Sequence, residues 1–288
     1  MSFEQVMGTV QGMLGATDAL AAIGAELSVK TSGIEADPAI EAALGAVWTA
    51  AGLPDLSSLA PPQQAMVLGI IRLYFAQANE LLSDPGRAPG WTYTDPLVLE
   101  GMGRGSMMIP TLLAQIPEFE TVESLLDVGV GVGLLAVSAA SAWPGAKIVG
   151  LDVWEPALER ARANVSAAGL EDRITLRNQD LTALDDIDRY DCAWLPTFFL
   201  SDATLANAMP NVVRAVAPNG WIVLGLFRQP PNALGQATMA LRTIRSGGAE
   251  LDPKRAAEIL DAAGCASVRS IEPGGSGPIT FVIGQKPA

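Results

Sequence analysis

A glycine-rich segment contains the residues best suited to hold a ligand. Gly129, Gly131 and Gly133 alternate with valines, after an apolar run that includes Asp127 and before another that begins at Leu134. Glycine lets a backbone turn tightly and lets a ligand approach without an intervening Cβ. The N–H groups at the start of a following helix favour a bound carboxylate or phosphate. The spacing predicts a strand, a ligand-binding loop and a helix, although a glycine loop alone can also be an ordinary turn.

A second acid stands where a nucleoside would need it. Asp152 ends the apolar run that begins at Ile148, in the predicted strand that follows the glycine loop. An acid at this place can accept hydrogen bonds from both hydroxyls of a ribose, and capping the next helix is its alternative role. Dinucleotide-binding loops carry GxGxxG, which would need glycine where Leu134 stands. An NAD-dependent oxidoreductase is therefore disfavoured.

The pattern GxGxG, with Asp127 two residues before its first glycine, resembles the first motif of class I S-adenosylmethionine-dependent methyltransferases. The resemblance implies S-adenosyl-L-methionine as cofactor and S-adenosyl-L-homocysteine as product, with Asp152 on the ribose and Asp127 toward the methionine ammonium end. It also implies cofactor contacts at the three glycines and at six further residues, namely Val153, Trp154, Asp180, Leu181, Leu195 and Pro196. Trp154 could instead belong to the core, and Asp180 could be a loop acid.

The chain has no histidine, which excludes a histidine base, a Ser-His-Asp triad and a histidine-ligated metal site. Cys192 and Cys265 form no CxxC pair, so we expect no metal and two reduced, buried thiols. A methyl group on a sulfonium is already activated, and transfer depends mainly on alignment in a desolvated pocket. An acid, a tyrosine or water must take any proton, unless the acceptor is an amine, an acidic enol or phenol, or an activated carbon.

The acceptor is expected beyond the carboxyl ends of the strands, beside the loops 196–199 and 227–230. Phe198 and Phe199 favour an aromatic or apolar acceptor, with core packing as an equal alternative. The candidate catalytic residues are Tyr93, Thr197 and Arg228. Tyr93 and Trp91 could cover the pocket or pack at a domain junction. Arg104 and Arg228 could anchor an acidic substrate or be solvent-exposed.

Residues 119–288 alternate between strand and helix patterns, which predicts an α/β fold. We expect a Rossmann-like seven-stranded methyltransferase sheet that ends in an antiparallel carboxy-terminal hairpin. The expected strands are 122–128, 147–153, 174–177, 191–195, 221–227, 267–271 and 279–283, and the loop of the hairpin is 272–278. The expected helices are 134–143, 155–169, 200–216, 232–245 and 253–263.

Residues 1–118 carry helical patterns and are expected to form an all-helical lid and dimerisation domain. The expected helices are 3–26, 38–51, 61–82 and 96–115, with Gly8, Gly12, Gly15 and Gly24 breaking or tightly packing the first. Its apolar stretches predict a homodimer through residues 1–85. A monomer whose helices cover the active site is the alternative.

The net charge of −13, with only 18 Lys and Arg in 288 residues, argues against a nucleic-acid substrate. The segment that begins Leu195-Pro-Thr-Phe also lacks the Asn/Asp-Pro-Pro-Tyr/Phe pattern of enzymes that methylate bases or glutamine. The amino terminus lacks the basic region of a secretion signal. The longest uncharged run, 128–146, is interrupted by glycines and Pro144, so we expect no membrane association and a cytoplasmic protein.

These features together predict methyl transfer from S-adenosylmethionine to a small, aromatic or apolar metabolite, at oxygen, nitrogen or carbon. A non-methylating use of the same fold, as a cyclase-like or pericyclase-like protein or a ligand-binding module, is the alternative. The glycines and acids predict that the cofactor binds, and they do not predict that its methyl group leaves.

Overall fold

The computed structural model describes residues 2–273 and 278–288, which divide into two compact units. The first comprises Met1–Pro85 and Asp95–Gly105, and the second comprises Gly86–Thr94 and Ser106–Ala288. Residues 86–94 and 106–118 are thus part of the second unit. The assignment of 1–118 as a lid and dimerisation domain and of 119–288 as a cofactor domain stays a prediction.

The first unit is helical, as predicted. Its elements are α1 (Phe3–Ser32), α2 (Pro38–Ala50), η1 (Leu56–Ser58), α3 (Pro61–Ser83) and α4 (Pro96–Ser106). The start of α2 follows from its sequence, because the Asp37 side chain accepts a 2.8 Å hydrogen bond from the N–H of Ala39 and Pro38 takes the first helical position. Leu27, Trp48, Leu68 and Ile71 form the buried core of this unit.

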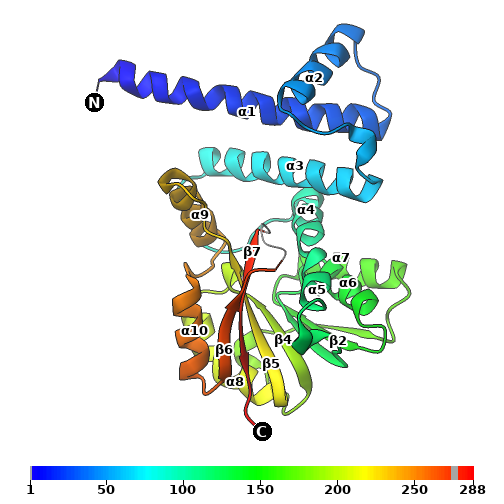
Figure 1. Ribbon diagram of the computed structural model, residues 1–288, viewed down its shortest axis with the longest axis vertical. Helices are drawn as coiled ribbons and strands as arrows, with labels where there is room; N and C mark the ends of the chain where they lie inside the picture. The colour runs from blue at the N-terminus through cyan, green and yellow to red at the C-terminus, as the bar shows by residue number, and fades with distance from the viewer. Residues whose placement is uncertain (1, 274–277) are drawn as a thin grey trace. The chain divides into compact units, whose positions relative to one another are not determined.

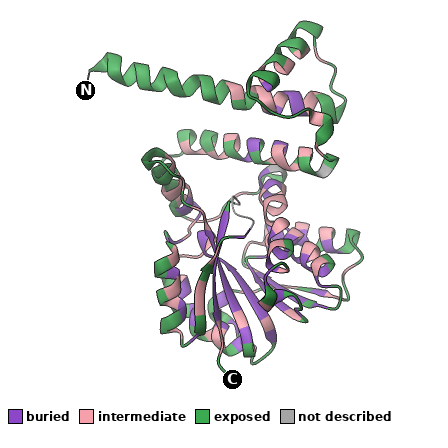
Figure 2. Cartoon of the chain, in the orientation of Figure 1, coloured by how far each residue is buried: buried purple, intermediate pink, exposed green. Residues whose placement is uncertain are grey.

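The first helix is longer than predicted. The glycines do not break α1, and Gly8, Gly12 and Gly15 have no neighbouring atom within 4 Å of the position of a Cβ. Gly24 alone packs tightly, since a Cβ there would lie 3.0 Å from Cγ2 of Ile71. The exposed amino-terminal part of α1 is visible in Figure 2.

Two described helices, Phe3–Ser32 and Gln63–Ser83, are long and apolar enough to cross a membrane by length and composition alone. Core helices and leader sequences satisfy the same two criteria, so this carries little weight.

The second unit is built on the predicted seven-stranded sheet, with strand order β3-β2-β1-β4-β5-β7-β6 (Figure 1). The strands are β1 (Ser124–Val128), β2 (Lys147–Asp152), β3 (Ile174–Asn178), β4 (Tyr190–Pro196), β5 (Val216–Phe227), β6 (Ala266–Ile271) and β7 (Ile279–Gln285). Strands β1 to β5 are parallel, and β7 pairs antiparallel with β5 and β6, as expected. Part of the predicted hairpin loop, residues 274–277, lies outside the described residues.

Helices cover both faces of this sheet. The helices of this unit are α5 (Met108–Leu113), α6 (Leu134–Ala142), α7 (Glu155–Ala167), α8 (Asp202–Ala215), α9 (Ala233–Arg245) and α10 (Pro253–Ala262), with the short helices η2 (Pro117–Phe119), η3 (Leu181–Ala183) and η4 (Thr197–Phe199). One core cluster packs α5, α6 and α7 against the sheet, and the other packs α8 and α10 against it. The predicted helix 96–115 is wrong as a single element, because the chain turns at Met107 between α4 and α5.

Close packing in the middle of the sheet gives a test of this architecture. A Cβ on Gly225 in β5 would lie 2.1 Å from the ring of Trp194 in β4, which is 2% exposed. We expect Gly225→Ala to lower the free energy of unfolding by about 1–3 kcal/mol, the scale of overpacking in a core. Gly145→Ala is the matched control, because no atom lies within 4 Å of its Cβ position. Equal urea midpoints for the two variants would contradict the predicted packing.

Candidate functional site

The glycine loop between β1 and α6 adopts a backbone conformation that side chains disfavour. The φ angles are +65° at Gly129, +56° at Gly131 and +78° at Gly133, all in the left-handed region. The loop is tied to the sheet by the N–H of Val130, which donates to the carbonyl of Leu151 at 2.9 Å. Glycine is therefore needed at all three positions by conformation alone, whatever the loop binds.

Two neighbours that the sequence analysis missed hold this loop. A Cβ on Gly150 in β2 would lie 2.6 Å from Cγ2 of Val130, so only glycine leaves room there for the loop. The Asn164 side chain of α7 donates a 2.9 Å hydrogen bond to the carbonyl of Val132. A glycine inside a predicted strand was an available signal, because such a glycine often marks a close backbone approach.

The two predicted acids lie on either side of the loop and have different surroundings. Oδ2 of Asp152 accepts from the N–H of Gly131 and Oδ1 from the N–H of Trp154, both at 2.8 Å. Burial raises the pKa of Asp152, and the hydrogen bonds from Trp154 and Gly131 oppose that rise. The structure therefore links the ribose-binding candidate directly to the glycine loop.

For Asp127, no hydrogen bond from a described residue opposes the effect of burial on the pKa. Its side chain is 1% exposed, and its Oδ2 has no hydrogen-bond partner among the described residues. Burial, and secondarily the charge of Asp152, raise the pKa of Asp127 well above its usual range. A buried carboxylate oxygen without a partner fits a cationic ligand group such as the ammonium of S-adenosylmethionine.

The other predicted cofactor residues differ in how far they are exposed. Val153 is 61% exposed beside Asp152, and the indole N–H of Trp154 donates to the carbonyl of Tyr93 at 2.7 Å. Leu181 and Leu195 are buried in the core, so only their backbones could contact a ligand. Pro196 lies at the end of β4 next to the glycine loop, since a Cβ on Gly129 would be 3.5 Å from its ring.

Asp180 acts as a helix cap in this structure. Its carboxylate accepts from the N–H of Thr182 at 2.7 Å and from the Thr182 hydroxyl at 2.6 Å. These hydrogen bonds, that from the hydroxyl above all, lower the pKa of Asp180. The side chain is solvent-exposed, so a role toward adenine stays a prediction.

The three candidate catalytic residues have different partners in the contacts that the structure describes. The buried Thr197 hydroxyl donates to the carbonyl of Gly225 at 2.8 Å, which commits it to joining β4 and β5. Arg228 forms an ion pair with Glu272. The guanidinium carbon of Arg87 lies over the ring of Tyr93, 5.9 Å from the centre of that ring. Their catalytic roles stay predictions.

An aromatic cluster extends from the segment 86–94 to the ends of β4 and β5. The ring centres of Trp91 and Tyr93 lie 4.9 Å apart, and Trp91 contacts Phe199 edge to face at 5.1 Å. Phe198 in turn stacks on Phe227 with centres 4.2 Å apart. Phe198 and Phe199 thus belong to one cluster, of which Phe198 and Phe227 also line a cavity.

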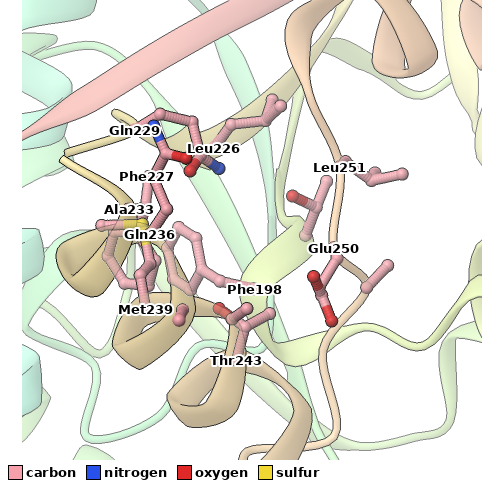
Figure 3. Close-up of a pocket in the computed structure, with 14 residues that line it drawn as sticks. Phe198, Leu226, Phe227, Gln229, Ala233, Gln236, Met239, Thr243, Glu250 and Leu251 are labelled. Carbon is pink, nitrogen blue, oxygen red and sulfur yellow. The ribbon is translucent and has the colours of Figure 1, made fainter. Parts of the chain in front are cut away.

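This cavity has a volume of about 420 Å³ and lies next to Thr197, immediately after Pro196 (Figure 3). Residues of the two predicted loops line it, as do residues of α9 and of the segment 249–251, which the sequence analysis did not anticipate. The lining comprises Thr197, Phe198, Leu226, Phe227, Gln229, Ala233, Gln236, Ala237, Met239, Ala240, Thr243, Ala249, Glu250 and Leu251. Its size suits a small organic molecule.

Among the described residues no group of three or more His, Cys, Asp or Glu side chains could hold a metal ion. Cys192 and Cys265 are free and buried, and burial raises the pKa of both thiols. Neither thiol is therefore poised as a nucleophile at neutral pH.

Comparison with known proteins identifies part of the second unit. Residues 125–220 match the family model of a methyltransferase domain. The ribosomal protein uL3 glutamine methyltransferase of Bordetella pertussis is 38% identical over 93 residues, which cover 32% of this chain and 31% of that protein. The demethylmenaquinone methyltransferase of Thermus thermophilus is 34% identical over 108 residues, which cover 37% of this chain and 48% of that protein. The chain thus matches less than half the length of either curated relative.

Solved structures resemble the chain over nearly its whole length. The S-adenosylmethionine-dependent methyltransferase SibL has a TM-score of 0.70 at 20% identity, covering 97% of this chain and 99% of that one. Human N-acetylserotonin methyltransferase, in complex with S-adenosylmethionine, has a TM-score of 0.71 at 14% identity and 100% coverage of both chains. At such identities the likeness shows the fold.

Residues 125–220 are thus a methyltransferase domain, and the chain has the fold of class I S-adenosylmethionine-dependent methyltransferases with a helical amino-terminal region. The resemblance inferred from the glycine loop is confirmed. A methyltransferase domain implies S-adenosylmethionine as the cofactor, and the buried, unpartnered Asp127 and the glycine loop fit it.

The unpartnered carboxylate gives a testable pH dependence. Because the pKa of Asp127 is raised in the fold, its ionisation destabilises the ligand-free protein progressively as the pH rises from the ordinary carboxylate range to that raised value. We expect Asp127→Asn to increase the free energy of unfolding at pH 7 by about 1–3 kcal/mol, the scale of an unsatisfied buried group. The increase should vanish in acid, where the wild-type carboxyl is protonated in both states.

Urea unfolding between pH 3 and pH 8 measures this difference. Asp172→Asn is the control variant, because the side chain of Asp172 is exposed to solvent and that of Asp127 is buried. An identical pH profile for Asp127→Asn and the wild-type protein would show that Asp127 is compensated in solution.

Proposed function

We propose that this protein transfers a methyl group from S-adenosylmethionine to a small aromatic or apolar metabolite. The observation that carries the proposal is the buried, unpartnered Asp127 beside a loop that requires three glycines. A purely structural loop would leave that carboxylate without compensation, whereas an ammonium group supplies it. The structural neighbours, which include a mitomycin 7-O-methyltransferase, support a small-molecule acceptor.

In this proposal Asp127 binds the ammonium group and Asp152 the ribose hydroxyls, while the glycine loop accommodates the methionine end. Val153, Trp154 and Asp180 lie on the side of the adenine, and Pro196 separates the cofactor from the acceptor cavity. When bound, the cofactor supplies a methyl group on a positively charged sulfur. A lone pair of the acceptor can attack this methyl carbon, and the sulfur leaves as the neutral thioether of S-adenosylhomocysteine.

The protein itself would promote the reaction mainly by positioning the acceptor relative to the methyl group. No histidine is available, and the buried thiols of Cys192 and Cys265 remain protonated at neutral pH. The cavity would hold the acceptor in line with the methyl group, and this alignment can account for much of the rate of such a displacement. The site of methylation, oxygen, nitrogen or carbon, then depends on the acceptor. Two free cysteines support a cytoplasmic, soluble protein.

We further propose a homodimer through the helical unit. Six apolar side chains of α1 recur at helical spacing and are 37–76% exposed, namely Phe3, Val6, Met7, Val10, Met13 and Leu14. Such a continuous apolar face supports association with a second copy.

Leu14→Glu should convert this dimer to a monomer, because it places a charge in the apolar face. Ala16→Glu adds the same charge away from that face and should leave the dimer intact. Light scattering over a hundredfold range of concentration measures the mass of each variant. A wild-type mass that stays near the 29.9 kDa of one chain would refute the dimer.

Cofactor binding is tested by two glycines with the same backbone strain. Gly131 and Gly169 have φ angles of +56° and +64°, so alanine at either should cost about 1–2 kcal/mol of stability. Only Gly131→Ala should weaken the binding of S-adenosylmethionine, by tenfold or more (~1.4 kcal/mol), because only that Cβ would point into the cofactor site. Calorimetric titration with unchanged affinity in Gly131→Ala would mean that the loop is only a turn.

Release of S-adenosylhomocysteine decides between methyl transfer and a non-methylating use of the fold. Incubation with S-adenosylmethionine and a panel of aromatic hydroxyl and amine compounds should release it together with an equal amount of methylated product, measured by mass spectrometry. Tight cofactor binding without release for any acceptor would favour a cyclase-like or ligand-binding role.

A further inference from the structure

The acceptor cavity is lined by one negatively charged residue and by no positively charged one among the described residues. Glu250 carries the only charge among the described residues that line the cavity, and the others are apolar or neutral. The predicted anchors for an acidic acceptor, Arg104 and Arg228, are not among these lining residues, and Arg228 is paired with Glu272. The expectation of an acidic acceptor therefore finds no support in the cavity.

One wall of the cavity, the aromatic wall, is formed by Phe198 and Phe227. The rings of Phe198 and Phe227 stack with an interplanar angle of 20°. Phe199 contacts Phe198 edge to face at 4.9 Å, which helps to fix its orientation. Aromatic walls bind planar molecules by stacking, and their faces attract a nearby cation.

Glu250 is held across from that wall by its backbone. The N–H of the preceding Ala249 donates to the carbonyls of Leu200 at 2.9 Å and Thr197 at 3.2 Å. Gly248 packs so closely on η4 that a Cβ there would lie 2.1 Å from the carbonyl oxygen of Phe198. These contacts position the backbone that carries Glu250, and Figure 3 shows Glu250 on the side of the cavity opposite Phe198 and Phe227.

We propose that the cavity selects planar acceptors that carry a protonated nitrogen, with Glu250 as the anchor for that cation. This inference rests on the proposed function for the identity of the cavity as an acceptor site. A carboxylate on the acceptor would meet the charge of Glu250 within a chain of net charge −13, whereas an ammonium group would be attracted to both Glu250 and the aromatic wall.

Three indoles of nearly equal shape test the selection. Tryptamine carries an ammonium group, tryptophol a neutral hydroxyl and indole-3-acetate a carboxylate at pH 7. Calorimetric titration of the protein saturated with S-adenosylhomocysteine should rank them in that order. Because Glu250 is exposed, we expect tryptamine to bind about three- to fivefold tighter than tryptophol, the range of a partly screened ion pair.

Glu250→Gln should abolish the preference for tryptamine and leave the affinity for tryptophol within twofold. The matched control is Glu258→Gln, which removes an exposed carboxylate from α10 and should preserve the full ranking. Selection unchanged in Glu250→Gln, or no binding of any indole, would overturn the proposal. Because these titrations measure acceptor binding alone, selection by Glu250 together with no methyl transfer would refute the proposed function and not this inference.

Discussion

The site depends on one uncompensated charge. The carboxylate of Asp127 is buried at the end of β1, and its Oδ2 has no hydrogen-bond partner among the described residues, which costs free energy in the absence of a ligand. The surrounding sheet must be stable enough to tolerate it. Two apolar core clusters, one on each face of the sheet, supply that stability, and the strand end is therefore free to serve binding instead of packing.

The glycine loop converts this charge into a defined site. Left-handed backbone at Gly129, Gly131 and Gly133 turns the chain sharply, and the N–H of Gly131 fixes the carboxylate of Asp152. Gly150 leaves room for the loop from the neighbouring strand. Asp152 and the loop are thus positioned by each other. Pro196 ends the neighbouring strand β4, and the next residue, Thr197, lines the cavity.

The sequence predicted those elements of the fold that are determined by residues close together in the chain. The alternation of strands and helices, the hairpin at the carboxy terminus and the start of α2 at Asp37 and Pro38 depend on residues close together in sequence. The spacing of the glycines likewise predicted the loop between β1 and α6. The predicted break in α1 failed because an exposed helix tolerates glycines at modest cost. The single helix 96–115 failed because Pro110 has no N–H to donate to the carbonyl of Ser106, where α4 ends, and is instead accommodated in the first turn of α5.

The rest could not be predicted because it depends on contacts that only the fold creates. Glu250 lies more than fifty residues from Thr197 in sequence, and hydrogen bonds from Ala249 bring it to the cavity. Asn164 reaches the glycine loop from a different helix. Neither residue carries a motif, so neither could be distinguished from an ordinary surface side chain.

The division of the chain has a consequence for how such a protein can evolve. The chain passes between the two units three times, after Pro85, Thr94 and Gly105. A single genetic crossover cannot therefore exchange one complete unit for that of a relative. A crossover at residue 86 would carry α4 away from α3, on which Gly101 packs against Gly69, and one at residue 106 would separate Trp154 from the Tyr93 carbonyl. Exchange of one complete unit would require three breakpoints, one at each boundary, so the helical and cofactor-binding units are expected to be inherited together.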